Sequence, residues 1–378
     1  MQEKIKQIFK QKFGDPEGAL YASAGRINLI GEHTDYNGGF VFPGAIDKVI
    51  MAEIRPNGTD TVRVFSVDID EYVEFGLREE DAPAQSWARY IFGICREIIK
   101  RGGTVKGFDT VFAGNVPLGA GLSSSAALES CFAFALNDLF NDNKIDKFDL
   151  VLIGQATEHN YCGVNCGIMD QFASVFGKKD NLMRLDCRSR EYEYFPFHPQ
   201  GYKLVLVDSR VKHELADSPY NKRRESCERV AKTLGVETLR DADMQMLLDA
   251  KEKISDEDFN RAKFVIEEKD RVLDVCDALL RDDYETVGRK MYETHRGLSK
   301  DYEVSCEELD YLNDIARECG VTGSRIMGGG FGGCTINLVK EDLYDHFIEE
   351  ATDRFEAKYG HKPQIYDVII SDGARRIS

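Results

Sequence analysis

The stretch PLGAGLSSSAA, residues 117–127, sets two glycines and three consecutive serines between a strand-like segment and a helix-forming run. Gly119 and Gly121 let backbone N–H groups approach an anionic ligand closely, and the following helix directs its positive end toward the same charge. Serine hydroxyls can reach phosphate or a bound magnesium ion. The loop therefore predicts a polyphosphate site and points to phosphoryl transfer.

The alternative interpretation of the three serines is an ordinary helix cap, because serine is a favoured N-cap residue. A cap, however, needs only one serine. The flanking runs GFDTVFAGNVP, residues 107–117, and AALESCFAFALNDLF, residues 126–140, predict a strand and a helix, the context that a phosphate loop requires. No glycine-rich segment ends in Gly-Lys-Ser or Gly-Lys-Thr, and no protein-kinase catalytic-loop signature is present, so both of those nucleotide folds are disfavoured.

The composition is that of an acidic globular chain. Its 378 residues include 49 basic and 66 acidic ones, a formal net charge of -17, and 42% are apolar. At roughly 150 residues per domain this length predicts two or three domains. The acidic surplus opposes non-specific attraction to nucleic acid or anionic lipid, so we expect neither nucleic acid nor membrane as a partner.

The start of the chain and its cysteines predict a cytoplasmic protein. The opening MQEKIKQIFKQKFG, residues 1–14, predicts an amphipathic helix and lacks the uninterrupted apolar core of a signal peptide. No segment has the apolar length of a membrane span. The ten cysteines lack metal-ligand spacing, which predicts reduced thiols without a zinc site or disulfide framework.

No low-complexity tract, internal repeat or long linker divides the chain. After an apolar–polar alternation at residues 191–197, the segment HPQGYKLVLVDS, residues 198–209, opens a new strand, and a charged stretch from Asp217 to Met291 predicts helix. We therefore place a domain boundary near residue 197, between domains of residues 1–197 and 198–378.

A second glycine cluster, GSRIMGGGFGGCTINLV at residues 323–339, contains the dinucleotide-binding spacing at Gly328, Gly330 and Gly333. The run that follows is strand-like and not helical, so the context of a Rossmann site is missing. Two interpretations stay open: a tight loop packed against another backbone, and a glycine-rich wall beside the phosphates.

A third segment, GRINLIGEHTDYNGG at residues 25–39, places Glu32, His33, Asp35 and Asn37 in a glycine-bounded turn after an apolar strand. Polar side chains in such a place are costly unless they are solvated or bind a ligand. Carboxylates accept hydrogen bonds from neighbouring hydroxyls and histidine can donate or accept, so the set fits a neutral sugar. Arg26, just ahead of the turn, is able to grip a phosphate or a carboxylate with two hydrogen bonds.

A fourth segment, EHNYCGVNCGIMDQFASVFG at residues 158–177, begins with Glu158 on a helical run. Asp170 follows a glycine-containing turn and has apolar neighbours on both sides, an unusual setting for a charge. The alternative role for Asp170 is an N-cap of the helix that begins near Gln171.

Together, GRINLIGEHTDYNGG, PLGAGLSSSAALE, CGIMDQF and GSRIMGGGFGGCTI resemble the galactokinases of the GHMP kinase superfamily. The resemblance spans nearly the whole chain and implies an α+β fold of two domains with the active site in the cleft between them. It also implies transfer of the γ-phosphoryl group of ATP to the 1-hydroxyl of α-D-galactose, giving galactose 1-phosphate and ADP, the first committed step of galactose catabolism.

The resemblance implies a role for each matched residue. Asp170 is the expected catalytic base for the sugar's 1-hydroxyl, and Arg26 is expected to steady it and the developing phosphoryl charge. Asp35 is expected to accept from the 3- and 4-hydroxyls, and Tyr220 to close over the sugar. The implied sets are Glu32, His33, Thr34, Asp35 and Tyr220 for the sugar; Ser66, Gly119, Ala120, Gly121, Leu122, Ser123, Ser124 and Ser125 for ATP; and Ser125 and Glu158 for Mg²⁺.

Two other functions remain open on the sequence alone. One is a kinase for a related sugar, N-acetylgalactosamine or arabinose. The other is a sensor that binds galactose and ATP without turnover, although the serine loop, Arg26 and Asp170 are all intact, whereas a pure sensor can lose any of them. ATP and galactose are the expected partners, and a monomer is a plausible state.

Overall fold

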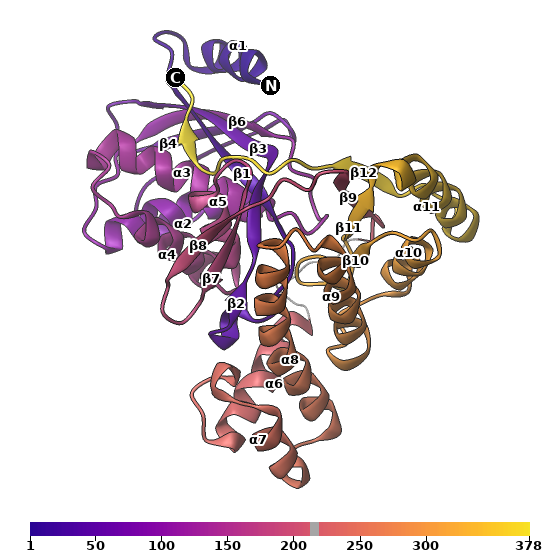
Figure 1. Ribbon diagram of the computed structural model, residues 1–378. Helices are drawn as coiled ribbons and strands as arrows, with labels where there is room; N and C mark the ends of the chain where they lie inside the picture. Colours follow the sequence, from indigo (N-terminus) through magenta and orange to yellow (C-terminus); the bar gives the residue numbers. More distant parts are fainter. Residues whose placement is uncertain (212–218) are drawn as a thin grey trace.

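Three β-sheets with helices packed on them organise the chain (Figure 1). The computed structural model describes residues 1–211 and 219–378. The first sheet has six strands in the order β13-β1-β3-β6-β4-β5. Its strands are β1 (Ala19–Asn28), β3 (Pro43–Pro56), β4 (Val62–Ser66), β5 (Glu71–Phe75), β6 (Phe108–Gly114) and β13 (Arg375–Arg376).

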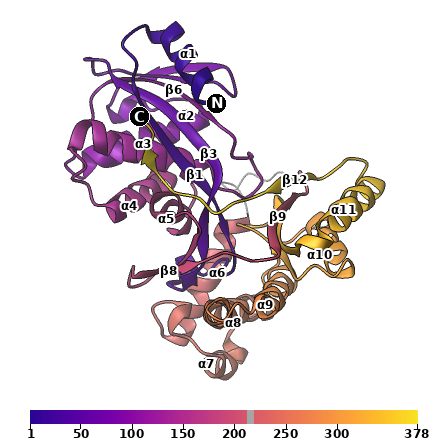
Figure 2. The same cartoon turned by 45° about the horizontal axis from the view of Figure 1, so that its top comes forward.

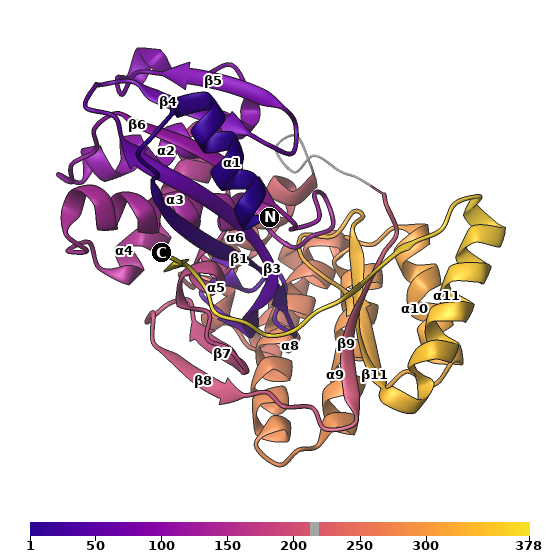
Figure 3. The same ribbon diagram turned by 90° about the horizontal axis from the view of Figure 1, so that it is seen from above.

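Both faces of the six-stranded sheet are covered, as the view from above shows (Figure 3). Alternate residues of β6 divide between two cores: Phe108 and Phe112 face the large one, whereas Val111 and Ala113 face the helix at the start of the chain. This division follows from the two-residue period of a strand. The covering helices are α1 (Gln2–Phe13) on one face, and α2 (Ser86–Lys100), α3 (Ser124–Asn141), α4 (Lys147–Thr157) and α5 (Met169–Phe176) on the other side.

The predicted opening helix is confirmed as α1. Ile5 and Phe9, four residues apart, are its buried positions and lie on one helical face. The helix ends at Gly14, whose φ of 70° is easy for glycine and unfavourable for other residues.

A second sheet of four strands, in the order β10-β11-β9-β12, forms the centre of the C-terminal half. Helices α8 and α9 lie toward one face, and α10 and α11 pack on the other (Figure 2). The elements of this half are β9 (Tyr202–Asp208), α6 (Pro219–Leu234), α7 (Met244–Asp249), α8 (Asp256–Leu279), α9 (Tyr284–Arg296), α10 (Glu307–Glu318), β10 (Gly323–Ile326), β11 (Cys334–Lys340), α11 (Tyr344–Tyr359) and β12 (Gln364–Asp367).

The charged stretch predicted as helix is divided among α6, α7, α8 and α9, and its first residue, Asp217, lies outside the described residues. The predicted strand after residue 198 is confirmed as β9. A small third sheet precedes it, made of β2 (Phe40–Val41), β7 (Asn181–Asp186) and β8 (Tyr192–Pro196).

The end of the chain returns to the first sheet. After β12, Ile370 forms an isolated bridge with Ile46, and β13 pairs with β1 (Figure 1). The last few residues therefore lie with the N-terminal half, although they follow the boundary that we predict near residue 197. The two halves are therefore joined at both ends of the C-terminal segment.

Candidate active site

One cavity of about 470 Å³ brings together most of the side chains that the sequence analysis assigned to the active site. The serine loop, the turn after β1 and the start of α5 form its wall, and Tyr220, Gly328 and Gly329 contribute from the C-terminal half. The cavity thus lies between the two halves. The assigned residues that line it are Arg26, Glu32, His33, Asp35, Gly119, Gly121, Leu122, Ser123, Ser124, Ser125, Glu158, Asp170 and Tyr220.

Asp170 and Arg26 form a two-pronged ion pair in this cavity. Nε and Nη2 of Arg26 each lie 2.7 Å from one carboxylate oxygen of Asp170. Arg26 Nη1 also donates to the carbonyl of Gly121, and Ser123 donates its hydroxyl to Asp170. Burial opposes the charge of the guanidinium, yet the carboxylate of Asp170 raises the pKa of Arg26 overall. The pair therefore holds two charges and the serine loop in one fixed arrangement.

Neither the serine loop nor Asp170 caps a helix through its side chains, so both capping alternatives are wrong. Helix α3 has Ser123 as its N-cap residue, but no side-chain cap hydrogen bond forms. Helix α5 begins at Met169 after Ile168, so Asp170 lies inside the first turn and caps nothing. Ser123 donates instead to Asp170, and Asp170 accepts from Arg26, so neither side chain serves a helix end.

The second glycine cluster packs against the back of the serine loop. A Cβ atom on Gly121 would lie 3.0 Å from the carbonyl oxygen of Met327, and one on Gly328 would lie 3.2 Å from that of Gly121. Both glycines have left-handed φ angles, 76° and 78°. The interpretation of a tight loop packed against another backbone is therefore confirmed. Gly328 and Gly329 also line the cavity, and a wall beside the phosphates stays a prediction.

Two buried carboxylates, Glu158 and Glu129, lie near Ser125. Burial raises the pKa of Glu158 to about 7 even though Ser125 donates a hydrogen bond to it, and the charge of Asp170 adds to the rise. Glu129, one turn after Ser125 on α3, is fully buried; burial and the charge of Glu158 raise its pKa well above the usual range. Gln171 donates to Glu129 at 3.0 Å. Such a concentration of negative charge favours a bound cation.

The donor set beside Ser125 fits Mg²⁺. A hydroxyl and a carboxylate are hard oxygen donors, and Mg²⁺ commonly takes one or two protein ligands and fills its other positions with phosphate oxygens and water. Among residues 1–211 and 219–378, no three or more His, Cys, Asp or Glu side chains are arranged to hold a metal by themselves. A site completed by nucleotide phosphates is consistent with that finding.

The polar turn after β1 forms another part of the cavity wall. Asp35 lies in the single-turn 3₁₀ helix Asp35–Asn37, and its carboxylate presses so closely on Gly167 that a Cβ there would overlap it. Burial, followed by the charge of Asp170, raises the pKa of Asp35 to about 7. His33 is buried with a φ of 61°, and burial lowers the pKa of its imidazole to about 3. His33 is therefore neutral at physiological pH.

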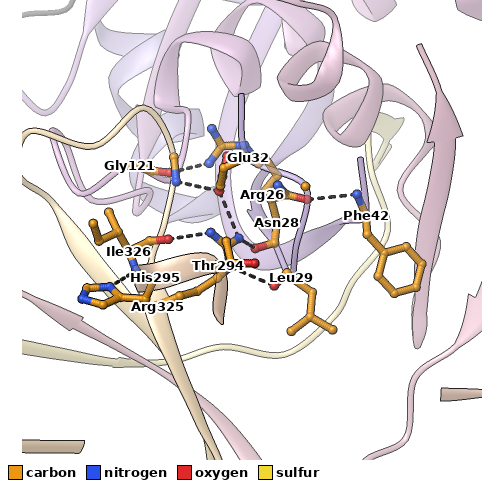
Figure 4. Close-up of polar contacts among 12 residues, drawn as sticks. Arg26, Asn28, Leu29, Glu32, Phe42, Gly121, Thr294, His295, Arg325 and Ile326 are labelled. Atoms are coloured by element: carbon orange, nitrogen blue, oxygen red, sulfur yellow. Dashed lines mark hydrogen bonds and ion pairs between the residues drawn. The ribbon is translucent and has the colours of Figure 1, made fainter. Parts of the chain in front are cut away.

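The C-terminal half holds this turn in place (Figure 4). Arg325 on β10 is fully buried, and its Nε donates to the carbonyl of Leu29 at 2.9 Å. One oxygen of Glu32 accepts from Arg325 Nη2 at 3.0 Å and from the backbone N–H of Gly328 at 2.8 Å. The backbone N–H of Gly31 donates to buried Glu268 at 2.8 Å. The turn is thus positioned by residues 237 to 297 positions away in the sequence.

Of the other assigned residues, Tyr220 lines the cavity, whereas Thr34, Ser66 and Ala120 lie outside its wall. Tyr220, in the first turn of α6, lines it, with its ring centroid 5.4 Å from that of His33. Thr34 is fully buried and donates its hydroxyl to the carbonyl of Phe40 at 2.6 Å, so it supports the turn from outside the wall. Ser66 at the end of β4 and Ala120 in the serine loop are buried outside the wall as well.

Nothing in the sequence singled out the part of the wall that α2 contributes. Ser86, Arg89 and Tyr90 lie there on α2, at the i, i+3 and i+4 spacing of one helical face, a signal that is readable once the helix is placed. The sequence could not predict that these three residues line the cavity, because it does not show which face of the helix meets the cavity. The remaining unassigned wall residues are Pro117, Tyr161, Cys162, Val164, Cys166, Gly167, Met169, Gly328 and Gly329.

Known families and proteins match this chain along its length. The galactokinase galactose-binding signature matches residues 7–56, the GHMP kinases N terminal domain residues 89–178, and the GHMP kinases C terminal domain residues 276–357. A galactokinase from Thermotoga petrophila is 42% identical over 93% of this chain and 98% of its own length. The chain belongs to the galactokinase family. A galactokinase from Clostridium acetobutylicum is 40% identical over 100% of this chain and 98% of its own length.

Solved structures agree with the galactokinase assignment. The crystal structure of Lactococcus lactis galactokinase complexed with galactose matches with a TM-score of 0.95 and 31% identity, covering 100% of both chains. The mevalonate kinase of Methanococcus jannaschii matches at 0.66 with 16% identity, over 94% of this chain and 99% of its own, which shows the fold alone. The predicted GHMP kinase fold is confirmed, and the family makes the chain an ATP-dependent sugar kinase. In the part of the chain that is described, no helix has the length and apolarity to span a bilayer.

Proposed function

We propose that the chain transfers the γ-phosphoryl group of ATP to the 1-hydroxyl of α-D-galactose, giving galactose 1-phosphate and ADP. The observation that carries the proposal is the bidentate Arg26–Asp170 pair, which lies between the serine loop and the sugar turn in one cavity. The galactokinase relatives and the galactose complex of the Lactococcus enzyme support the choice of sugar. Residues 1–197 and 198–378 are assigned as the two domains, and the free state of all ten cysteines supports a cytoplasmic location.

Asp170 and Arg26 are assigned to the reacting centre. The oxygen of the sugar's 1-hydroxyl forms a bond to the γ-phosphorus of ATP, the bond from that phosphorus to the β–γ bridging oxygen breaks, and the hydroxyl proton passes toward Asp170. Because the transition state of phosphoryl transfer is loose, orientation of the hydroxyl and stabilisation of charge contribute more than early proton removal. Arg26 supports both, since it fixes the carboxylate and brings a positive charge to the reacting oxygens.

ATP is assigned to the serine loop, residues 119–125. The backbone N–H groups of the loop and the positive end of α3 suit the phosphates. Ser125 and Glu158 are the residues that would hold Mg²⁺, which, when bound, offsets the negative charge of the phosphates. The raised pKa of Glu158 is consistent with a carboxylate that gains a cation on binding. Ser66 stays a predicted nucleotide contact.

Galactose is assigned to the turn of Glu32, His33 and Asp35, with Tyr220 beside it and Thr34 supporting the turn. Asp35 has a raised pKa and forms no ion pair with a described residue, so the hydroxyl donors of a neutral sugar suit it well. A buried acceptor directed to the axial 4-hydroxyl disfavours glucose, because the 4-epimer leaves that acceptor without a partner.

The decisive experiment combines turnover and binding with a panel of sugars. Purified protein with Mg-ATP is incubated with galactose, glucose, N-acetylgalactosamine or arabinose, ADP release is followed, and the product is identified by ³¹P NMR. We expect galactose 1-phosphate and a kcat/KM for galactose at least about 100-fold above that for glucose. Binding of galactose and ATP without ADP release would make the chain a sensor, and a higher kcat/KM for another sugar would replace galactose as the substrate.

A further inference from the structure

A chain of hydrogen-bonding groups runs from His33 into the C-terminal half. His33 Nδ1 lies 2.8 Å from Tyr36 Oη, which lies 2.7 Å from Tyr302 Oη, which in turn lies 3.3 Å from Cys227 Sγ. Tyr302 and Cys227 are fully buried, and Tyr36 is half-buried. None of these three residues takes part in the chemistry proposed above.

Packing holds this chain of groups in one arrangement. The ring centroid of Tyr302 lies 4.8 Å from that of His33 and 5.1 Å from that of Phe264. Arg223 Nε donates to the carbonyl of Tyr302 at 2.7 Å. Asn37 donates to the carbonyl of His33 at 2.9 Å and so fixes the left-handed backbone there. The imidazole is thus constrained through both its backbone and its ring.

His33 carries a single proton that either ring nitrogen can hold. Burial, together with the positive charge of Arg223, lowers the pKa of the imidazole to about 3, so the ring is neutral. The tautomer of a neutral imidazole is set by the partner of each nitrogen. Nδ1 is taken by Tyr36, so Nε2 is the nitrogen left for a ligand. Nε2 is buried and makes no hydrogen bond to any described residue, and the backbone of Gly329, which also lines the cavity, favours protonation of the ring.

Two directions of donation are conceivable, and they leave Nε2 in different states. If Nδ1–H donated to Tyr36, Tyr36 to Tyr302, and Tyr302 to the sulfur of Cys227, Nε2 would carry a bare lone pair. It would then be one more acceptor in a wall where the carboxylates of Glu32 and Asp35 already accept. In the opposite direction Cys227 donates to Tyr302, Tyr302 to Tyr36, and Tyr36 to Nδ1, and Nε2 carries the proton.

We propose that Tyr36 and Tyr302 are positioning residues that fix His33 as its Nε2–H tautomer and thereby give the sugar site a hydrogen-bond donor. This rests on the proposed function in one respect, the placement of the sugar at His33. The other side chains of the turn that line the cavity, Glu32 and Asp35, accept hydrogen bonds when ionised. A sugar also has oxygens that only accept, such as the ring oxygen, and a neutral N–H satisfies these without adding charge.

The tautomer is directly measurable on the full chain. In protein labelled with ¹⁵N-histidine, long-range ¹H–¹⁵N correlations near pH 7.5 distinguish the two neutral tautomers, and His33→Gln identifies the His33 signals by their loss. We expect the wild-type protein to show the Nε2–H pattern. We expect Tyr36→Phe, which removes the donor to Nδ1, to show the Nδ1–H form or a mixture.

Kinetics and binding complete the test. Tyr36→Phe should raise the KM for galactose about 5- to 20-fold, with kcat and the KM for ATP within about threefold of wild type. Tyr302→Phe should have a smaller effect in the same direction, because Tyr36 keeps its own hydroxyl. Tyr292→Phe is the matched control, since the Tyr292 hydroxyl donates to the carbonyl of Val321 at 2.9 Å, away from His33. It should change neither the tautomer nor the KM for galactose.

The outcomes separate this proposal from the proposed function. An Nδ1–H tautomer in the wild-type protein, or a Tyr36→Phe protein with unchanged tautomer and galactose KM, overturns the positioning role even if galactose is phosphorylated. If Tyr36→Phe does not fold, the same two readouts on Tyr302→Phe decide. A tautomer that depends on Tyr36 in a protein that does not phosphorylate galactose keeps the positioning role and removes the kinase assignment.

Discussion

Asp170 and Asp35 line the same cavity, but their electrostatic surroundings differ. Asp170 receives two hydrogen bonds from Arg26 and one from Ser123. Asp35 forms no ion pair with an arginine or lysine of the described chain, and burial with the nearby charge of Asp170 raises its pKa to about 7. The proposed phosphoryl-transfer centre therefore has its charge compensated in the free protein, whereas the carboxylate at the proposed sugar site has no ion-pair partner and is available to hydroxyl donors. This difference matches a reaction in which charge develops at one end of the cavity and a neutral ligand is held at the other.

The largest effect should follow from removing the charge of Asp170. Asp170→Asn keeps the shape of the side chain but loses the acceptor for the hydroxyl proton, so kcat should fall about a thousandfold while galactose binding stays within about threefold of wild type. Steady-state kinetics and calorimetric titration with galactose measure the two quantities. Asp149→Asn, in the exposed first turn of α4, is the matched control. A variant with near-normal turnover would remove Asp170 from the reacting centre and with it the contrast with Asp35.

The next effect concerns the support of the sugar turn. Arg325→Met breaks the buried contacts with Glu32 and Leu29 and leaves a buried carboxylate without its cation, which should lower the free energy of unfolding by about 3–5 kcal/mol. Denaturant unfolding measures the loss. Arg229→Met removes the partly exposed pair with Asp258 and should cost less than about 1 kcal/mol. Equal losses in the two variants would show that the Arg325–Glu32 contact has no special role.

Asp35→Asn tests both the role of Asp35 in galactose binding and the cost of its buried charge. Loss of a charged acceptor should raise the KM for galactose about 10- to 100-fold. The same change should stabilise the free protein by about 1–2 kcal/mol at pH 8, because it removes a buried charge close to Asp170.

The stability gain should depend on pH in a defined direction. The pKa of Asp35 is raised in the folded state, so the folded protein binds a proton at this carboxyl more tightly than the unfolded chain does. The contribution of Asp35 to the free energy of unfolding of the wild-type protein therefore falls as the pH rises from about 4 through 7. The advantage of Asp35→Asn should therefore grow between pH 5 and pH 8 in thermal unfolding. An advantage that stays constant or shrinks over this range would mean that folding does not raise the pKa of the Asp35 carboxyl.

The strand, turn and helix around the serine loop were predictable because their signal is local. Eleven consecutive residues, 117–127, supply the glycines, the serines and the helix start, and the flanking strand and helix are confirmed as β6 and α3. The roles of Arg26 and Asp170 came from the family resemblance, and the structure brings these residues together although they are 144 positions apart. The capping alternative for Asp170 was reasonable from local sequence and fails because a distant arginine offers a stronger partner.

The supports of the sugar end were not predictable in the same way. Arg325 lies in the second glycine cluster, but nothing in its neighbourhood predicts a contact with Glu32, because only the packing of β10 against the end of β1 creates it. Tyr302 follows a charged helical region and reads as an ordinary core residue. Thr34 was assigned to the sugar, while its buried hydroxyl donates to the backbone of its own turn. Contacts set by tertiary packing leave little trace in a single sequence.

The smallest effect should come from the glycine contact behind the serine loop. Gly121 has a φ of 76° and lies so close to Met327 that a Cβ would stand 3.0 Å from its carbonyl oxygen. Gly121→Ala should therefore shift the loop by a few tenths of an ångström and raise the KM for ATP about 5- to 30-fold, a cost of about 1–2 kcal/mol, with the KM for galactose nearly unchanged. Gly58→Ala introduces the same backbone strain at a φ of 73°, where nothing lies within 4 Å, so it is the control for the effect of backbone strain alone. If the galactose KM rose as much as the ATP KM, the two ends of the cavity would be mechanically coupled and the division drawn between them would have to be given up.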